Sequence, residues 1–314
     1  MQAEFVEPIG DDIYAVDTGF HRPGLVAAYL IVDDGRAAFI DTGTNFAVPR
    51  LLAALNAVGL EPDAVDWVIP THVHLDHAGG AGLLMRSLPR ARMAVHPRGA
   101  PHMIDPSALH AGATAVYGAQ EMARSYGELV GVEETRIVTT ADGMTVQLAG
   151  RTLEFIDTPG HARHHHCIWD ARSSCWFTGD TFGLGYPEFT NQNGRWVLPT
   201  SPPVQFEPES LKSSVRRLLA RNPAGICLTH YGRVDEVQRL GALLLEQIDE
   251  MVAIARQHEH SGDRHAAMTH ALTAAYRRRL AEHGFADVDA KLALLAFDIE
   301  LNARGIGVWL DRSA

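Results

Sequence analysis

The stretch THVHLDHAGG, residues 71–80, holds three histidines and one aspartate within six positions, followed by two glycines. Imidazole is the commonest protein ligand for metal ions. In an extended or tightly turned backbone, side chains two positions apart project to the same side, so His72 and His74 can chelate one ion. Asp76 and His77 follow at the expected start of a helix and can turn toward a second point nearby. The alternative is a helix cap among surface histidines, which this density of ligand residues disfavours.

Three later motifs supply further ligand types. TPGH at 158–161, TGD at 178–180 and LTHYG at 228–232 each follow an apolar, strand-like segment. Open α/β folds gather their sites at the carboxyl ends of strands. His161, Asp180 and His230 are therefore expected to meet the first cluster, although each of them alone is weak evidence.

The elements that must position these residues alternate between strand and helix patterns over about the first 230 residues. The apolar segment Trp67–Pro70 predicts a strand that leads directly into the histidine cluster, and Ala78–Leu88 predicts the helix after it. DDG at 33–35 indicates a hairpin turn. The Pro/Gly/Asn-rich stretch Gly183–Pro208 begins just after Asp180, and we expect it to form one wall of a substrate pocket.

The tail has a different pattern, with helical periodicity and almost no strand signal from about residue 235. It predicts two or three helices with breaks near residues 261–262 and 284. We expect a catalytic domain at 1–232 and a helical extension at 233–314. The extension is interpreted as a packed appendage, with a substrate lid or a dimer contact as alternatives.

Composition limits the classes of function. The chain has 314 residues, of which 46% are hydrophobic and 21% charged, and its net charge is −11. That charge argues against a general nucleic-acid surface, which needs a basic face. Three cysteines give no disulfide framework. No apolar run is long enough to cross a bilayer, and the acidic N-terminus does not resemble a secretory signal. We expect a cytoplasmic protein that acts on a small molecule, binds neither nucleic acid nor membrane, and can form a homodimer.

The chain resembles the metallo-β-lactamase-fold hydrolase superfamily over about residues 10–232. The matching motifs are THVHLDH, TPGH, TGD and LTHYG. The resemblance implies an α/β protein, an αββα four-layer sandwich with two metal ions at one edge of the sheets. It assigns His72, His74 and His161 to the first ion. By the same resemblance, Asp76, His77 and His230 hold the second ion and Asp180 bridges the two.

Some branches of that superfamily fit the sequence less well than others. True β-lactamases usually lack a bridging aspartate at the position of Asp180. The segment TPGHARHHH departs from the TPGHTxGH pattern of glyoxalase II-like enzymes, and the acidic net charge disfavours the tRNA-processing nucleases. The helical tail and the segment His96–Pro106 look more like a broad group of bacterial lactonases, arylesterases and phosphodiesterases, some of whose relatives carry iron.

The expected reaction is hydrolysis of an ester, lactone or phosphodiester by a hydroxide generated between two divalent ions. Asp76 is the candidate for accepting the proton and passing it to the leaving group. Nitrogen and carboxylate ligands suit zinc, our first expectation, and also iron and manganese. A di-iron protein that binds or senses oxygen is the alternative function, and a non-catalytic binding protein is a third.

Four further residues are candidates for hydrogen bonds to the ligands or for contacts with substrate. One of the histidines at 164–166 can hydrogen-bond to a ligand, and we choose His165, although a polar strand start explains the run equally well. The phenols of Tyr186 and Tyr231 can donate to a substrate oxygen, with packing as the alternative role. Trp196, in the long loop, is expected to contact an apolar or aromatic acyl group.

Overall fold

The computed structural model describes residues 4–202 and 205–313. It divides into two compact units. Unit 1 comprises residues 1–157, 164–179 and 224–233, and unit 2 comprises residues 158–163, 180–223 and 234–314. The first three residues of the predicted acidic N-terminus, and residues 203 and 204 of the predicted 183–208 loop, lie outside the described part. The predicted domain boundary at 232/233 stays a prediction.

Unit 1 contains a seven-stranded sheet whose strands follow one another in chain order. The first four strands are antiparallel neighbours, and β4 to β7 run parallel. Parallel neighbours need helical or looped crossovers, which is why the helix patterns of the sequence fall between these later strands. The strands are β1 (Val6–Gly10), β2 (Ile13–Asp17), β3 (Ala27–Asp33), β4 (Arg36–Ile40), β5 (Val65–Ile69), β6 (Arg92–Val95) and β7 (Ile137–Thr139).

The predicted DDG hairpin joins β3 to β4. Asp33 pairs with Arg36, so only Asp34 and Gly35 form the turn. Both have positive φ, 44° and 71°. That conformation matches the twist of the flanking strands in a two-residue hairpin and is the reason Asp-Gly is favoured there.

A second sheet has six strands in the order β15-β14-β11-β10-β9-β8. β11 and β14 are parallel, and the hairpins β8–β9, β9–β10 and β10–β11 are antiparallel. Short β1 and β15 were not predicted, since neither has a sustained alternation. The strands are β8 (Thr145–Leu148), β9 (Arg151–Asp157), β10 (His166–Asp170), β11 (Cys175–Phe177), β14 (Gly225–Leu228) and β15 (Gly232–Val234).

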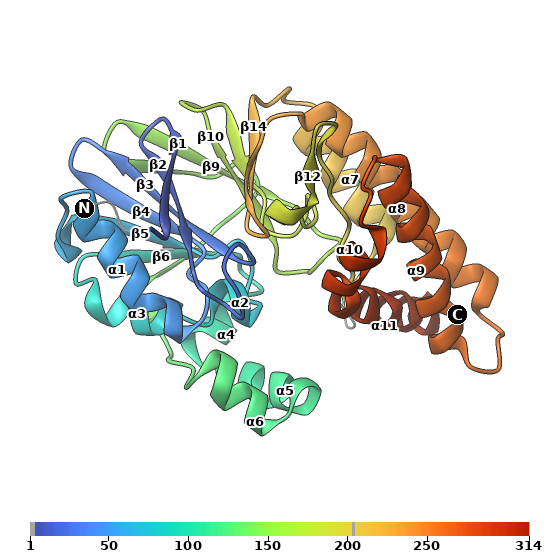
Figure 1. Ribbon diagram of the computed structural model, residues 1–314. Helices are drawn as coiled ribbons and strands as arrows, with labels where there is room; N and C mark the ends of the chain where they lie inside the picture. The colour runs from blue at the N-terminus through green and yellow to red at the C-terminus, as the bar shows by residue number, and fades with distance from the viewer. Residues whose placement is uncertain (1–3, 203–204, 314) are drawn as a thin grey trace. The chain divides into compact units, whose positions relative to one another are not determined.

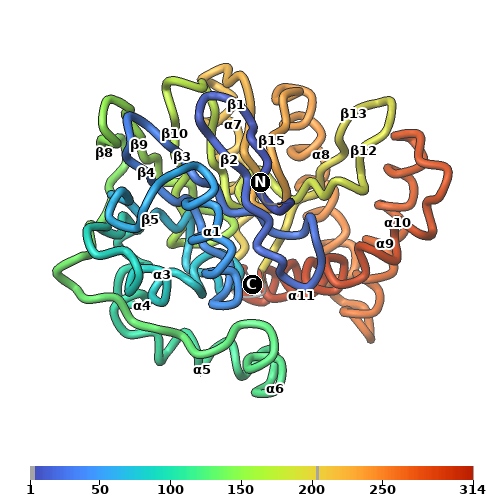
Figure 2. Tube along the Cα trace, turned by 60° about the vertical axis from the view of Figure 1, so that its left-hand side comes forward, coloured from blue at the N-terminus to red at the C-terminus, as the bar shows by residue number. Residues whose placement is uncertain are grey.

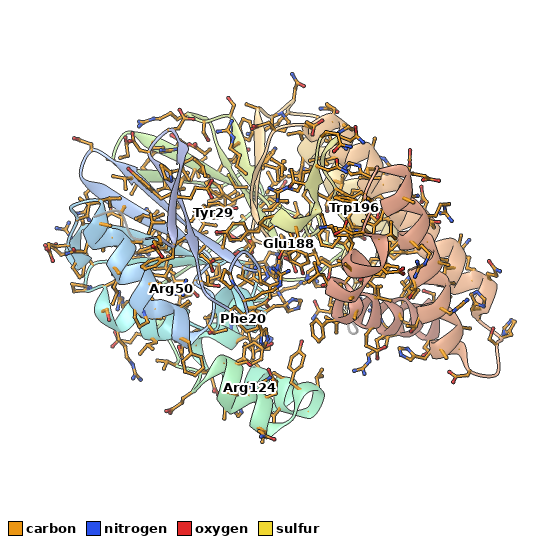
Figure 3. The ribbon with its side chains drawn as sticks, viewed as in Figure 1. Phe20, Tyr29, Arg50, Arg124, Glu188 and Trp196 are labelled. Carbon is orange, nitrogen blue, oxygen red and sulfur yellow. The ribbon has the colours of Figure 1, made fainter. Side chains whose placement is uncertain are left out.

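Two apolar clusters hold these layers together. One joins the two sheets through side chains such as Tyr29, Phe155 and Phe177, and Tyr29 lies inside the unit in Figure 3. The other joins the outer face of the first sheet to α1 (Val48–Ala57) and α3 (Ala81–Ser87), which cover that face in Figure 1. The expected helix at 78–88 is split: α2 (Leu75–Ala78) ends before α3 begins, at Gly79 and Gly80.

The region between β6 and β7 is mostly helical. It contains α4 (Ala100–Ile104), α5 (Ser107–Tyr117), α6 (Ala119–Glu121) and a π-helical turn, Met122–Tyr126. In Figures 1 and 2, α5 and α6 lie apart from α1 and α3. A small separate apolar cluster attaches this region to Leu75 at the start of α2.

Unit 2 is helical, apart from the two-residue strands β12 (Thr190–Asn191) and β13 (Gly194–Arg195). Helix α9 contacts α8, α10 and α11, and it runs beside α11 in Figure 2. Trp196, Phe189 and Tyr276 pack together in the core of unit 2. The helices are α7 (Pro208–Leu219), α8 (Val237–His258), α9 (Arg264–Glu282), α10 (Val288–Leu294) and α11 (Ala296–Ser313).

The helical character of the tail and both predicted breaks are confirmed. The predicted number of two or three helices is wrong, because the described tail contains four. The additional break lies at Leu295, whose φ and ψ of −89° and 2° leave the helical range while its side chain stays buried. None of the helices in the described part combines the length and apolarity needed to cross a bilayer.

Candidate metal centre

Each predicted ligand motif begins where a strand ends. β5 ends at Ile69, two residues before Thr71, and β14 ends at Leu228, two residues before His230. In unit 2, His161 follows the end of β9, and Asp180 follows the end of β11. The candidate ligand residues therefore follow strand ends, and their role as metal ligands stays a prediction.

Asp41, which follows β4, is a hydrogen-bond acceptor shared by several residues around the candidate site in unit 1. Its carboxylate is fully buried and accepts hydrogen bonds from the Thr71 backbone amide and the Thr229 hydroxyl, both at 2.7 Å. It also lies 3.0 Å from Nδ1 of His77. A carboxylate only accepts, so Nδ1 of His77 carries the proton and Nε2 keeps its lone pair.

His230, a second candidate ligand of unit 1, is oriented in the same way as His77. Nδ1 of His230 lies 3.0 Å from the carbonyl oxygen of Leu25, which can only accept. Its Nε2 is 3.3 Å from Oδ2 of Asp76, and Nε2 of His77 is 3.6 Å from the same oxygen. The ligand atoms of Asp76, His77 and His230 lie within 4.8 Å of one another.

This arrangement fits a metal cation. Two imidazole nitrogens with lone pairs and a carboxylate oxygen converge, and such electron-rich atoms repel one another without a positive charge between them. Nitrogen and carboxylate donors are those that divalent zinc, iron and manganese accept. The protein therefore presents a group of residues suited to a divalent metal ion.

His72 and His74 lie beside this group within unit 1. Nε2 of His72 is 2.8 Å from Nδ1 of His74, so both nitrogens face a common point. The ring of His72 also lies 4.0 Å from that of His77, centroid to centroid. The predicted chelation by residues two positions apart is geometrically available.

Unit 2 carries the other two predicted ligands. Nε2 of His161 lies 3.2 Å from Oδ2 of Asp180. Nδ1 of His161 lies 3.3 Å from the carbonyl oxygen of Thr200, so the ring again directs a lone pair toward a carboxylate. Gly160 has φ of 130° and lies where an added Cβ would meet the Leu211 backbone nitrogen at 2.2 Å. Only glycine allows the TPGH turn to pass this close to α7.

His165 lies behind the cluster and is fully buried. Its ring stacks on that of His72 at a centroid distance of 4.8 Å. A Cβ at Gly179 would come within 2.6 Å of its Nε2, so the glycine leaves room for the imidazole. The predicted role of His165 as a support for a ligand stays a prediction.

The three remaining candidates make packing contacts. The Tyr186 hydroxyl is 3.1 Å from Oδ1 of Asp298 in α11. Trp196 is 1% exposed, and in Figure 3 it lies among the helices of its unit. Tyr231 packs against the apolar cluster between the two sheets. Their predicted substrate contacts stay predictions, and the contacts observed are those of structural residues.

Some of the groups that orient the candidate ligands were not predictable from the sequence. The Leu25 carbonyl is a backbone group, and no side-chain pattern marks it. Thr229 precedes a ligand in LTHYG, which was a usable signal. Tyr117 and Tyr126 lie close enough to Asp76 for its charge to raise their pKa, and Phe20 packs on Tyr126; only tertiary structure brings these residues together.

Comparison with known proteins agrees with these observations. Over 216 residues the chain is 26% identical to the metallo-beta-lactamase fold-containing protein ST1585 of Sulfurisphaera tokodaii, covering 68% of this chain and 75% of that one. The crystal structure of ST1585 superposes with a TM-score of 0.64 at 20% identity, over 97% of this chain and all of the other. This likeness shows the same fold, including its mixed sheets and helices.

Two further relatives differ in activity. A hydroxyacylglutathione hydrolase of Acidiphilium cryptum is 30% identical over 204 residues, 64% of this chain and 62% of the other. A coenzyme F420H(2) oxidase of Methanothermobacter thermautotrophicus is 30% identical over 167 residues, 51% of this chain and 36% of the other. The family profile described as metallo-beta-lactamase superfamily matches residues 21–230. With its ligand motifs at the strand ends and two thirds of its length matched, the chain belongs to the metallo-beta-lactamase superfamily.

Proposed function

We propose that the protein is a binuclear metal-dependent hydrolase of a small-molecule ester, lactone or phosphodiester. The observation that carries the proposal is the convergence of Asp76, His77 and His230, with both imidazoles oriented by Nδ1 contacts. We infer that His72, His74 and His161 hold one ion, that the unit 1 group holds the other, and that Asp180 bridges them. Zinc is the first expectation, and iron and manganese are the alternatives.

Two divalent ions held by these residues would supply a water of lowered pKa and would polarise the oxygen of the bond to be broken. The protein's own residues supply orientation and proton transfer. Asp41 and the Leu25 carbonyl fix the two imidazoles of the unit 1 group, so that their lone pairs face inward. Asp76, whose side chain is 25% exposed, is the group that accepts a proton and returns it to the leaving oxygen.

The test combines metal analysis with a hydrolysis screen. Purified protein is loaded with zinc, iron or manganese and assayed on lactones, aryl esters and bis-aryl phosphates. We expect two ions per chain and turnover of at least one class. Asp76→Asn should lower kcat at least 100-fold, since positioned proton transfer contributes about that much. Full activity of Asp76→Asn with both ions bound would remove Asp76 from the mechanism, and absence of turnover in every class would refute the hydrolase.

The alternative is a di-iron protein that binds, reduces or senses oxygen. It is supported by the similarity to a coenzyme F420H(2) oxidase and by a ligand set without thiolate. A visible absorption band in the protein as purified, which bleaches on reduction and returns with oxygen, would favour it. Colourless protein with tightly bound zinc would favour the hydrolase. A small-molecule substrate, the absence of nucleic-acid and membrane partners, a homodimer and a cytoplasmic location stay predictions.

A further inference from the structure

Aromatic side chains from two separate segments of unit 1 gather near Asp76. One segment is the loop between β2 and β3, which carries Phe20. The other runs from the end of α5, which carries Tyr117, to the π-helical turn, which carries Tyr126. The rings of Phe20 and Tyr126 lie 5.5 Å apart, and those of Tyr117 and Tyr126 lie 5.8 Å apart. In Figure 3, Phe20 lies above the segment that carries Arg124.

Both segments are tied to the candidate metal group. The apolar cluster that contains Tyr126 includes Leu75, the residue before Asp76. The loop that carries Phe20 also contains Leu25, whose carbonyl orients His230. Burial and then the nearby Asp76 carboxylate raise the pKa of Tyr117 to about 12, and the same two causes raise the pKa of Tyr126. The aromatic cluster therefore borders the Asp76 and His230 side of the site.

The cluster is partly open. Tyr126 is buried and Tyr117 is 38% exposed. The loop is fixed by Asp17, which accepts from the amides of Gly19 at 2.7 Å and Gly24 at 3.0 Å. A fixed loop that holds Phe20 against the buried Tyr126, whose ring lies beside the partly exposed Tyr117, presents a preformed apolar surface.

We propose that Phe20, Tyr117 and Tyr126 form the wall that binds the apolar part of the substrate's leaving group, and that they make the enzyme prefer esters of aryl-bearing alcohols. The inference rests on the proposed hydrolase function. Asp76 is the residue that returns a proton to the leaving oxygen, so the group attached to that oxygen lies on the Asp76 side.

The selectivity test compares two acetate esters, 2-phenylethyl acetate and ethyl acetate, whose leaving alkoxides are similar in basicity. The readout is the ratio of their kcat/KM values. An aromatic contact contributes enough to change this ratio about tenfold. We expect Tyr126→Ala and Phe20→Ala each to lower the ratio about tenfold, and Tyr126→Phe to preserve it because the ring remains.

A binding measurement separates this inference from the function on which it rests. Calorimetric titration with 2-phenylethanol needs no turnover, and we expect the zinc-loaded protein to bind it more tightly than ethanol. Tyr117→Ala should weaken that binding, whereas Val116→Ala, at the neighbouring exposed position of α5, should leave it unchanged. Circular dichroism checks that each variant is folded.

The outcomes are distinct. If neither ester is hydrolysed but 2-phenylethanol binds and Tyr117→Ala weakens the binding, the aromatic wall stands and the proposed reaction fails. If esters are hydrolysed and folded Tyr126→Ala and Tyr117→Ala retain both the wild-type ratio and the wild-type affinity for 2-phenylethanol, the wall is wrong and the hydrolase stands.

Discussion

Asp41→Asn is the most informative single substitution in the site. Asp41 has φ of 55°, a conformation that asparagine tolerates better than most residues, so the backbone should survive the change. Asparagine keeps the size of the side chain but replaces one acceptor oxygen with a donor. In one amide orientation the NH2 group meets the Thr71 amide, and in the other it meets the donors of Thr229 and His77, so at least one hydrogen bond is lost.

The expected loss has two parts. A hydrogen bond to a charged group contributes about 1.5–3 kcal/mol, so the free energy of unfolding should fall by about 2–4 kcal/mol. Loss of a partner that orients a metal-binding histidine should also lower zinc affinity by about 10–100-fold. Urea unfolding of the metal-free protein measures the first part, and competition with a chromophoric chelator measures the second.

Asp170→Asn provides the matched control. Asp170 is also a fully buried carboxylate of unit 1, but it pairs with Arg151, whose Nη2 lies 2.6 Å from its Oδ2. It is the last residue of β10, whereas His166 is the first. We expect this variant to lose stability and keep its zinc affinity. Wild-type zinc affinity in folded Asp41→Asn protein would refute the claim that Asp41 orients His77.

Three other perturbations test the scaffold of unit 1. Burial, then the nearby His96, lowers the pKa of His166 to about 3. As pH drops from about 6.5 toward 3, the unfolded chain therefore takes up the proton first, and the free energy of unfolding falls by up to about 1.4 kcal/mol per pH unit. His166→Gln should flatten that part of the stability curve, measured by urea titration at each pH. Arg151→Leu leaves the buried Asp170 carboxylate without its ion-pair partner and should cost about 3–5 kcal/mol in chemical denaturation, with partial recovery when Asp170→Leu is added. Gly82→Ala would place a Cβ 1.7 Å from the Val130 carbonyl oxygen, and differential scanning calorimetry should show a loss of about 1–3 kcal/mol.

Much of this structure was predictable because its signals are local. The Asp-Gly hairpin, the strand ending before Thr71 and the helical period of the tail each depend on short-range patterns, and each is confirmed. The ligand motifs were recognisable because imidazole and carboxylate groups gathered after strands are costly in a plain core.

Long-range arrangement was not predictable in the same way. Nothing in the sequence near Leu25 shows that its carbonyl orients a histidine 205 positions later. Trp196 lies in a loop rich in proline and glycine, which suggested a pocket wall, yet its ring packs on Phe189 and Tyr276. An aromatic residue in such a loop serves a core or a pocket equally well, and tertiary packing decides between them.

The orientation of the ligands leads to a prediction about metal removal. His77 and His230 are oriented by groups of unit 1, and His161 by the Thr200 carbonyl of unit 2. Each unit thus carries candidate ligands that are already oriented by groups of the same unit. If both units serve one binuclear centre, bound ions stabilise both by mass action, by about 4 kcal/mol at a thousandfold excess over Kd. Hydrogen exchange with and without zinc should then show protection of residues 71–78 and also of residues 160–163 and 180–183. Protection confined to the unit 1 segment would refute a centre shared between the units.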